Sequence, residues 1–187
     1  PLLDLLLDQM DAKGREHLEP HRFLDWPSSG DETAIHGGLQ ALLTWALAAG
    51  ADLCDVLGRS DAARRCREGA ARMRCYSPPP TASKQAAALL ALAGYGDPVE
   101  WNRAVLARDP FRGLSTFYGY YVLEARALAG DYTGALEAIR RFWGGMLDLG
   151  ATTFWEDFNL DWTPNAAGIT APVPPGMADI HGDFGDY

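Results

Sequence analysis

Apolar residues recur along most of the chain at the three- and four-residue spacing of helices that bury one face. Within residues 1–10, Leu2, Leu3, Leu6 and Leu7 share one side of such a helix. The same spacing predicts further helices over residues 34–57, 62–75, 84–93, 98–107, 114–129 and 133–147. No segment shows sustained alternation of apolar and polar residues, so the pattern predicts an all-α fold.

Capping and breaking residues divide these helices into pairs joined by short turns. Residues 28–31 signal the start of a helix, with Asp31 and Glu32 suited to the positive end of its dipole. Ser60 or Asp61 is expected to cap the helix over residues 62–75, and Asp97 is a predicted N-cap. An array of helical hairpins forms either an open solenoid or a closed α/α toroid, and periodicity does not separate the two. Residues 129–139 would suit a tetratricopeptide-like repeat, but no constant period of about 34 residues runs along the chain.

Length and charge narrow the class of protein. The chain has 187 residues, which suits one domain, and 48% of them are hydrophobic, which argues against disorder. Its net charge of -9 leaves no basic surplus for the nucleic-acid backbone, so nucleic acid is not expected as the partner. No apolar run reaches the roughly 18 residues of a membrane span, so none is expected.

Cysteine and histidine usage gives no sign of a metal centre. Cys54, Cys66 and Cys75 are odd in number and lack the Cys-x-x-Cys spacing, so we expect packing residues rather than disulfides or zinc ligands. The histidines show no metal-binding spacing either. His181 follows the segment described next and could line a cleft there.

The segment 150–158 carries the most suggestive chemistry. It follows a predicted helix and opens a region rich in Pro, Gly and Asp, and it places Glu156 between Trp155 and Phe158. Aromatic rings can stack on a sugar and partly desolvate a carboxyl group, which moves its pKa toward working pH. Glu156 is therefore a candidate catalytic carboxylate. The neighbouring Asp157 and Asp161 are candidate partners, although acidic loop residues are usually solvated.

Several motifs occur in a fixed order around this segment. Residues 143–147 (Trp-Gly-Gly-Met-Leu) precede residues 150–156 (Gly-Ala-Thr-Thr-Phe-Trp-Glu), and Phe23-x-Asp25-Trp26 comes before a long apolar helix. A polar triplet, residues 83–85 (Ser-Lys-Gln), leads into an Ala/Leu helix. In this order the motifs resemble the six-hairpin catalytic domain of glycoside hydrolase family 78, the bacterial α-L-rhamnosidases. The resemblance covers nearly the whole chain and is strongest over residues 113–161.

The resemblance implies that residues 1–187 are part of an (α/α)6 toroid that hydrolyses terminal α-L-rhamnosyl groups by inversion, without metal or cofactor. By motif match, Glu156 is the general base. Trp155, Trp26 and Asp25 fall at substrate-contacting positions, but Trp155 could equally be a core residue and Asp25 could cap its own turn. An inverting enzyme holds its base and acid roughly 6.5–9.5 Å apart on opposite faces of the sugar.

The general acid of that family lies in an Arg-Asp-Glu motif, and nothing in this sequence matches it. Gly30-Asp31-Glu32 lacks the preceding arginine. We therefore expect a fragment, truncated at both ends and inactive alone, whose exposed apolar helix faces favour a homodimer. The alternatives are another six-hairpin glycosidase specificity and a non-catalytic helical-repeat scaffold that binds protein. The cellular compartment stays open.

Overall fold

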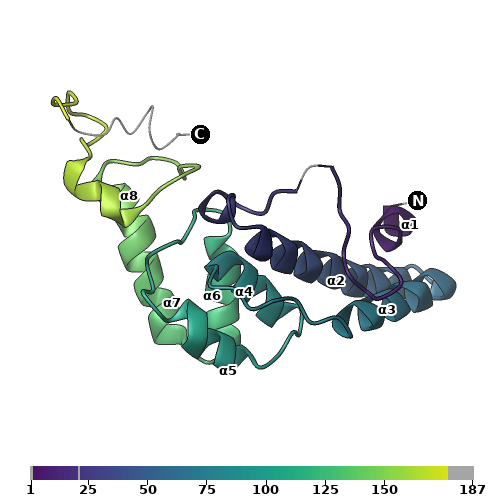
Figure 1. Ribbon diagram of the computed structural model, residues 1–187. Coiled ribbons are helices and arrows are strands. Elements are labelled where there is room, and N and C mark those ends of the chain that lie inside the picture. Colours follow the sequence, from purple (N-terminus) through teal and green to yellow (C-terminus); the bar gives the residue numbers. More distant parts are fainter. Residues whose placement is uncertain (1, 21, 177–187) are drawn as a thin grey trace.

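Helices and loops make up residues 2–20 and 22–176, which are the residues that the computed structural model describes (Figure 1). This part of the chain contains no β-strand, and one isolated antiparallel bridge joins Met10 and Glu16. The prediction of an all-α fold is confirmed. His181 lies outside the described residues.

The helices are α1 (Leu2–Leu7), α2 (Glu32–Val56), α3 (Ser60–Arg74), α4 (Lys84–Leu92), α5 (Pro98–Trp101), α6 (Gly119–Leu128), α7 (Tyr132–Ala138) and α8 (Gly144–Asp148). Two π-helical turns continue α5 and α7: η2 (Asn102–Leu106) and η3 (Ile139–Trp143). Two 3-10 turns, η1 (Trp26–Ser28) and η4 (Leu160–Asn165), lie in the long loops. Most predicted helices are therefore present with shifted ends.

Local hydrogen bonds explain where the helices begin. Asp97 accepts the Val99 N–H at 2.9 Å, so the predicted N-cap is confirmed. The helix start signalled by residues 28–31 is also present, and the Asp31 side chain is its N-cap, because it accepts the Ala34 N–H at 2.9 Å. The predicted cap of α3 is wrong, because Ser60 is already helical and Arg59 occupies the capping position without a side-chain bond.

The helix expected over residues 114–129 is shorter than predicted. It begins at Gly119, whose N–H donates to the carbonyl of Ser115 at 3.0 Å and closes a turn ahead of the helix. Leu114 and Ser115 are both buried, so this segment is held by packing although it is not helical. Tertiary contacts thus fix five residues that the apolar spacing assigned to a helix.

The paired helices form two layers (Figure 1). Helices α2, α4 and α6 are neighbours in succession, while α3 packs against α2, α5 against both α4 and α6, and α7 against α6. The buried apolar residues divide into three clusters that follow this succession along the chain. Repeated helical hairpins stacked side by side bury a continuous core in this way.

Helix α2 is the central element of the N-terminal half. It is the one helix among the described residues that is long and apolar enough to cross a bilayer. It packs instead between α1, α3 and α4, and its buried residues include Ile35, Leu43 and Leu47. Burial inside the protein therefore accounts for its apolar composition, as in the core helices of many globular domains.

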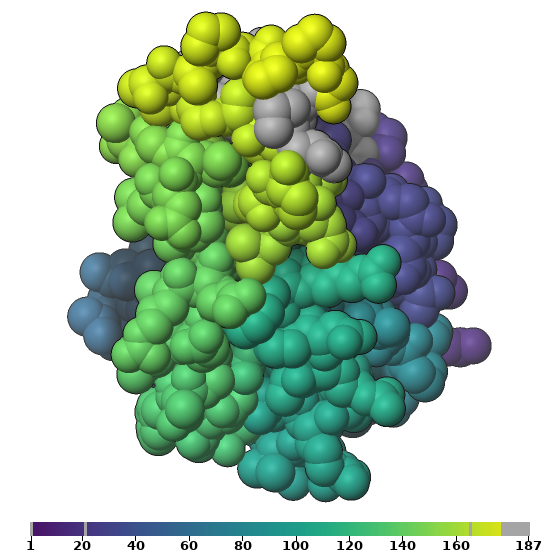
Figure 2. All heavy atoms as spheres, turned by 90° about the vertical axis from the view of Figure 1, so that its left-hand side faces the viewer, coloured from purple at the N-terminus to yellow at the C-terminus, as the bar shows by residue number. Residues whose placement is uncertain are grey.

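The C-terminal segment brings distant parts of the sequence together. After α8 the chain runs back to the loop that precedes α2, where Glu156 meets Trp26, and the yellow-green and purple spheres of these two parts lie close together in Figure 2. This contact creates the site described next.

Candidate active site

Glu156 and Trp26 meet although they are 130 residues apart. The indole Nε1 of Trp26 donates to Oε1 of Glu156 at 3.3 Å. Trp26 starts the turn η1, is 52% exposed, and stands edge-on against Phe23, with ring centroids 5.1 Å apart. Glu156 is exposed as well. The structure thus joins two residues that the sequence assigned to the same kind of site from separate motifs.

Trp155 holds this segment in place from inside the protein. Gly150 ends α8 with a φ of 96°, a left-handed conformation that favours glycine, and the chain then leads back over the core. The Trp155 ring is 1% exposed and packs edge-on against Phe158 at 5.7 Å. Of the two roles left open for Trp155, the structure supports core packing, because so little of the ring is available for a sugar to stack on. Its burial fixes the backbone from which Glu156 projects.

Asp25 lies buried directly beside Trp26, with 6% of its surface exposed. Burial raises the pKa of its carboxyl, and the charge of Asp157 adds to the rise, while the nearby Ser115 hydroxyl and Gln85 side chain oppose it. Its Oδ2 has no hydrogen-bond partner among the described atoms. Asp25 makes no regular side-chain capping bond to η1, although the neighbouring N–H of Trp26 also opposes the rise of its pKa.

Two further acidic groups share this environment. Burial raises the pKa of Asp157, opposed by the N–H of Phe158, and the charge of Glu156 raises it further. Burial, with a contribution from Asp25, raises the pKa of Tyr118 to about 12. Groups with raised pKa values that cluster around an exposed carboxylate are typical of sites for acid–base chemistry. Asp161 is exposed and follows Asn159, whose side chain accepts its N–H at 3.0 Å.

An apolar groove of about 980 Å³ extends from Glu156 over α6 and η3. Its walls include Phe117, Tyr120, Trp143 and Phe154, and Glu156 is the one charged residue that lines it. Tyr120 is 57% exposed and borders this groove. The ring faces the groove because the buried positions of α6 are taken by smaller residues such as Val122 and Ala125.

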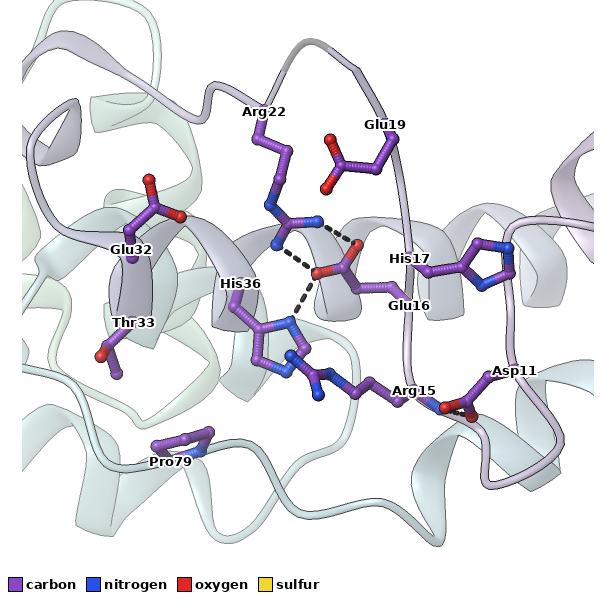
Figure 3. A pocket seen from close by; sticks show the side chains of 10 residues that line it. All are labelled: Asp11, Arg15, Glu16, His17, Glu19, Arg22, Glu32, Thr33, His36 and Pro79. Atoms are coloured by element: carbon purple, nitrogen blue, oxygen red, sulfur yellow. Dashed lines mark hydrogen bonds and ion pairs between the residues drawn. The ribbon is translucent and has the colours of Figure 1, made fainter.

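A second charged site, at the N-terminal half, was not predicted (Figure 3). Glu16 accepts hydrogen bonds from Arg22 at 2.6 Å, from the Leu18 N–H at 2.9 Å, and lies 2.5 Å from Nδ1 of His36. The other ring nitrogen of His36 lies 2.9 Å from the Tyr76 hydroxyl. These bonds satisfy the buried carboxylate from within the protein, which indicates a structural role.

A sequence signal for this network was present. His36, Gln40 and Thr44 recur every four residues on the otherwise apolar α2 and therefore share one face. All three are buried, and Gln40 Oε1 accepts the N–H of Glu16 at 2.7 Å. The residues around Asp25, by contrast, come from α4 and from residues 115–118, and no local spacing relates them.

No metal-binding group of three or more His, Cys, Asp or Glu side chains is present in residues 2–20 and 22–176. Cys54 and Cys66 are buried free thiols, and Cys75 is an exposed free thiol. The chain matches no known protein-family model, and no curated protein matches it.

Proposed function

We propose that this chain carries the water-activating side of an inverting glycoside hydrolase of the family 78 α-L-rhamnosidase type, with Glu156 as the general base. The observation that carries the proposal is the hydrogen bond of 3.3 Å from Trp26 Nε1 to Glu156 Oε1. It brings together the two motifs that the resemblance assigns to one sugar site. The exposure of both side chains leaves the carboxylate open to water and the indole ring open to a sugar.

In this proposal Glu156 removes a proton from water while the water oxygen bonds to the anomeric carbon of the rhamnosyl group. The bond from that carbon to the glycosidic oxygen breaks, and an acid on the opposite face gives a proton to the leaving oxygen. That acid belongs to the Arg-Asp-Glu motif, which this sequence lacks. The proposal therefore keeps the expectation that the chain alone is inactive.

Trp26 and Asp25 are the proposed contacts to the sugar. The exposed indole face of Trp26 offers a stacking surface next to the base. The Oδ2 of Asp25 is buried and unpartnered, so in this proposal it meets a sugar hydroxyl only after the turn η1 moves outward, and that bond would offset the cost of burying the carboxyl group. Trp155 is not part of the proposed sugar surface.

The layered helices support the toroid as the architecture of the intact domain. In an (α/α)6 toroid the inner helices are neighbours in succession, and α2, α4 and α6 have this relationship. The position of Glu156 favours the glycosidase over the protein-binding scaffold. It lies on a groove and forms no ion pair within the described part of the chain.

The test is Glu156→Gln in the complete enzyme, assayed on an aryl α-L-rhamnoside. Loss of a general base should lower kcat roughly 10²- to 10⁴-fold with little change in the unfolding midpoint. Glu124→Gln, at an exposed carboxylate of α6, is the matched control and should keep the wild-type rate. A wild-type rate for Glu156→Gln would overturn the base assignment, and faster cleavage of another aryl glycoside would favour the other six-hairpin specificity.

Self-association is the second part of the proposal. One face of the continuous helical segment α7, η3 and α8 exposes an apolar stripe of Tyr132, Leu136, Ile139 and Leu147. Glu137 and Arg140 beside this stripe already pair within one copy at 3.6 Å, so burial of the stripe against that of a second copy would supply the stabilisation of a dimer. Light scattering should therefore give a dimer for the 187-residue chain. A monomer at all concentrations would contradict this.

A further inference from the structure

A second cavity, of about 810 Å³, opens immediately beyond Trp26. Pro27 and Ser28, the other residues of η1, line it on one side. Lys84, Arg108 and Arg112 line it on the other sides. The turn η1 is therefore shared by two sites: its first residue contacts Glu156, and its next two residues border a cavity with three basic side chains.

Two side chains from the first turn of α4, Lys84 and Gln85, hold the loop that contains these arginines. Lys84 Nζ donates to the carbonyl of Val105 at 3.1 Å and to that of Arg108 at 2.5 Å. Gln85 Nε2 donates to the carbonyl of Gly113 at 2.7 Å. Both ends of the loop after η2 are therefore tied to α4, and the loop is held in one position over the cavity.

The middle of this loop is strained. Asp109 has a φ of 42°, the one non-glycine residue with positive φ in residues 2–20 and 22–176. Its carbonyl accepts the Arg112 N–H at 2.9 Å, which closes a turn from Asp109 to Arg112, and Arg108 directly precedes this turn. Backbone strain of this kind costs about 1–3 kcal/mol and is found preferentially at ligand-binding loops.

The charges of the cavity favour an anion. Arg108 and Arg112 are exposed, and neither forms an ion pair with a carboxylate in the described part of the chain. Two acids, Asp31 and Asp109, also line the cavity, so the basic groups exceed the acidic ones. Asp31 already accepts the Ala34 N–H as the N-cap of α2. The positive ends of the α2 and α4 dipoles meet here as well, because Asp31 and Ser83 are their N-caps.

The pocket in Figure 3 contains an arginine that is paired from within the protein. There, Arg22 is paired with the buried Glu16. In the cavity beyond Trp26, the two arginines have no such internal partner. Guanidinium groups that face an open cavity without a carboxylate are suited to bind a carboxylate or sulfate from outside.

We propose that this cavity binds the negatively charged group of the sugar unit to which the rhamnosyl group is attached, either a uronate carboxylate or a sulfate ester. The inference rests on the proposed function, because it places the rhamnosyl unit at Trp26 and Glu156. Glu156 contacts Trp26, and the cavity adjoins the same turn through Pro27 and Ser28, so a disaccharide across η1 would span both sites. Arg108 and Arg112 provide the charge, and Lys84 positions their loop.

Binding by the 187-residue chain tests the site without any need for catalysis. The probes are methyl β-D-glucuronide, methyl β-D-glucoside 6-sulfate and uncharged methyl β-D-glucoside, titrated while the arginine Nε–H signals are followed by NMR. The charged probes should bind and shift these signals, and the uncharged probe should bind at least about tenfold more weakly. The stronger of the two charged probes identifies the anion. Equal binding of all three would overturn the proposal.

Arg108→Gln and Arg112→Gln should each weaken the charged probe by about tenfold, and neither should alter the thermal midpoint, because both residues are exposed. The matched control is Arg103→Gln, at an exposed arginine of η2 that pairs with Glu100 outside the cavity and should leave binding unchanged. Undiminished binding by both cavity variants would refute the assignment of the anion to this loop.

In the complete enzyme, a rhamnosyl-glucuronate should have a kcat/KM about tenfold or more above that of its methyl ester, and Arg108→Gln should remove the difference. Equal rates for acid and ester would overturn the placement next to the rhamnosyl unit while leaving the hydrolase function intact. Absence of rhamnoside cleavage together with arginine-dependent binding of the charged probe would overturn the proposed function and leave the anion site standing.

Discussion

Glu16 and Asp25 lie in the same loop before α2, and the fold buries both, leaving 2% and 6% of each residue exposed. Burial alone raises the pKa of a carboxyl group. For Glu16, the hydrogen bonds from Arg22, His36 and the Leu18 N–H outweigh this and hold the pKa below its usual value. For Asp25, burial prevails and the pKa is raised.

The difference separates a stabilising carboxylate from one available to a ligand. A buried carboxylate whose oxygens are all paired joins parts of the fold, as Glu16 joins its loop to α2 in Figure 3. A buried carboxyl with an unpartnered oxygen costs stability, and the cost is recovered when a ligand supplies the missing partner. Asp25 has that property and lies beside Trp26 and Glu156.

The largest effect on stability should come from breaking the hydrogen-bond network around Glu16. Glu16→Gln removes the charge that pairs with Arg22 and leaves its half-buried guanidinium without a carboxylate, so the free energy of unfolding should fall by about 3 kcal/mol. Urea denaturation of the 187-residue chain measures this. Glu19→Gln, at an exposed carboxylate of the same loop, should change stability by less than about 0.5 kcal/mol. Equal stability of the two variants would show that the network contributes nothing.

Substitution of Asp25 should change the free energy of unfolding by a smaller amount and with the opposite sign. Asp25→Asn removes a buried charge that lacks a full set of partners and should raise the free energy of unfolding by about 1 kcal/mol at neutral pH. In the complete enzyme it should weaken rhamnoside binding if Asp25 contacts the sugar. Destabilisation comparable to that of Glu16→Gln would mean that Asp25 is a structural residue.

The pH dependence of the free energy of unfolding should distinguish Glu16 from Asp25 as well. The pKa of Glu16 is lowered from 4.5, so its stabilisation is present above 4.5 and is lost as pH falls through the folded-state value. The pKa of Asp25 is raised from 3.8, so its contribution is present below 3.8 and is lost as pH rises through the folded-state value. Relative to the wild type, the unfolding free energies of the two variants should converge in acid and diverge in opposite directions toward neutral pH.

The smallest effect is expected at Trp26, whose indole donates to Glu156 at the protein surface. Trp26→Phe keeps an aromatic ring but removes the donor to Glu156, so kcat/KM of the proposed complete enzyme should fall about two- to threefold with stability unchanged. Tyr120→Phe, which removes a hydroxyl from an exposed ring of the neighbouring groove, is the control and should be neutral. If the two variants behave alike, the Trp26–Glu156 bond has no role in catalysis.

The positions and types of the helices could be predicted from the sequence because the causes are local. Apolar spacing selects the face that is buried, and a side chain such as Asp31 or Asp97 satisfies an N–H two or three residues later in the chain. The same local reasoning failed over residues 114–118, where burial of Leu114 and Ser115 holds a non-helical turn.

In the candidate site, too, features with local causes could be predicted from the sequence and features with distant causes could not. Apolar spacing was enough to predict an all-α fold, and local motifs selected Glu156, Trp26 and Asp25 as residues of interest. The burial of Trp155, the exposure of Trp26 and the unpartnered Oδ2 of Asp25 near Asp157 are consequences of tertiary packing. The exposure and the electrostatic surroundings of a side chain depend on which distant helices pack around it. The residues adjacent in the sequence to Trp155, Trp26 or Asp25 therefore do not reveal whether each side chain is buried or paired.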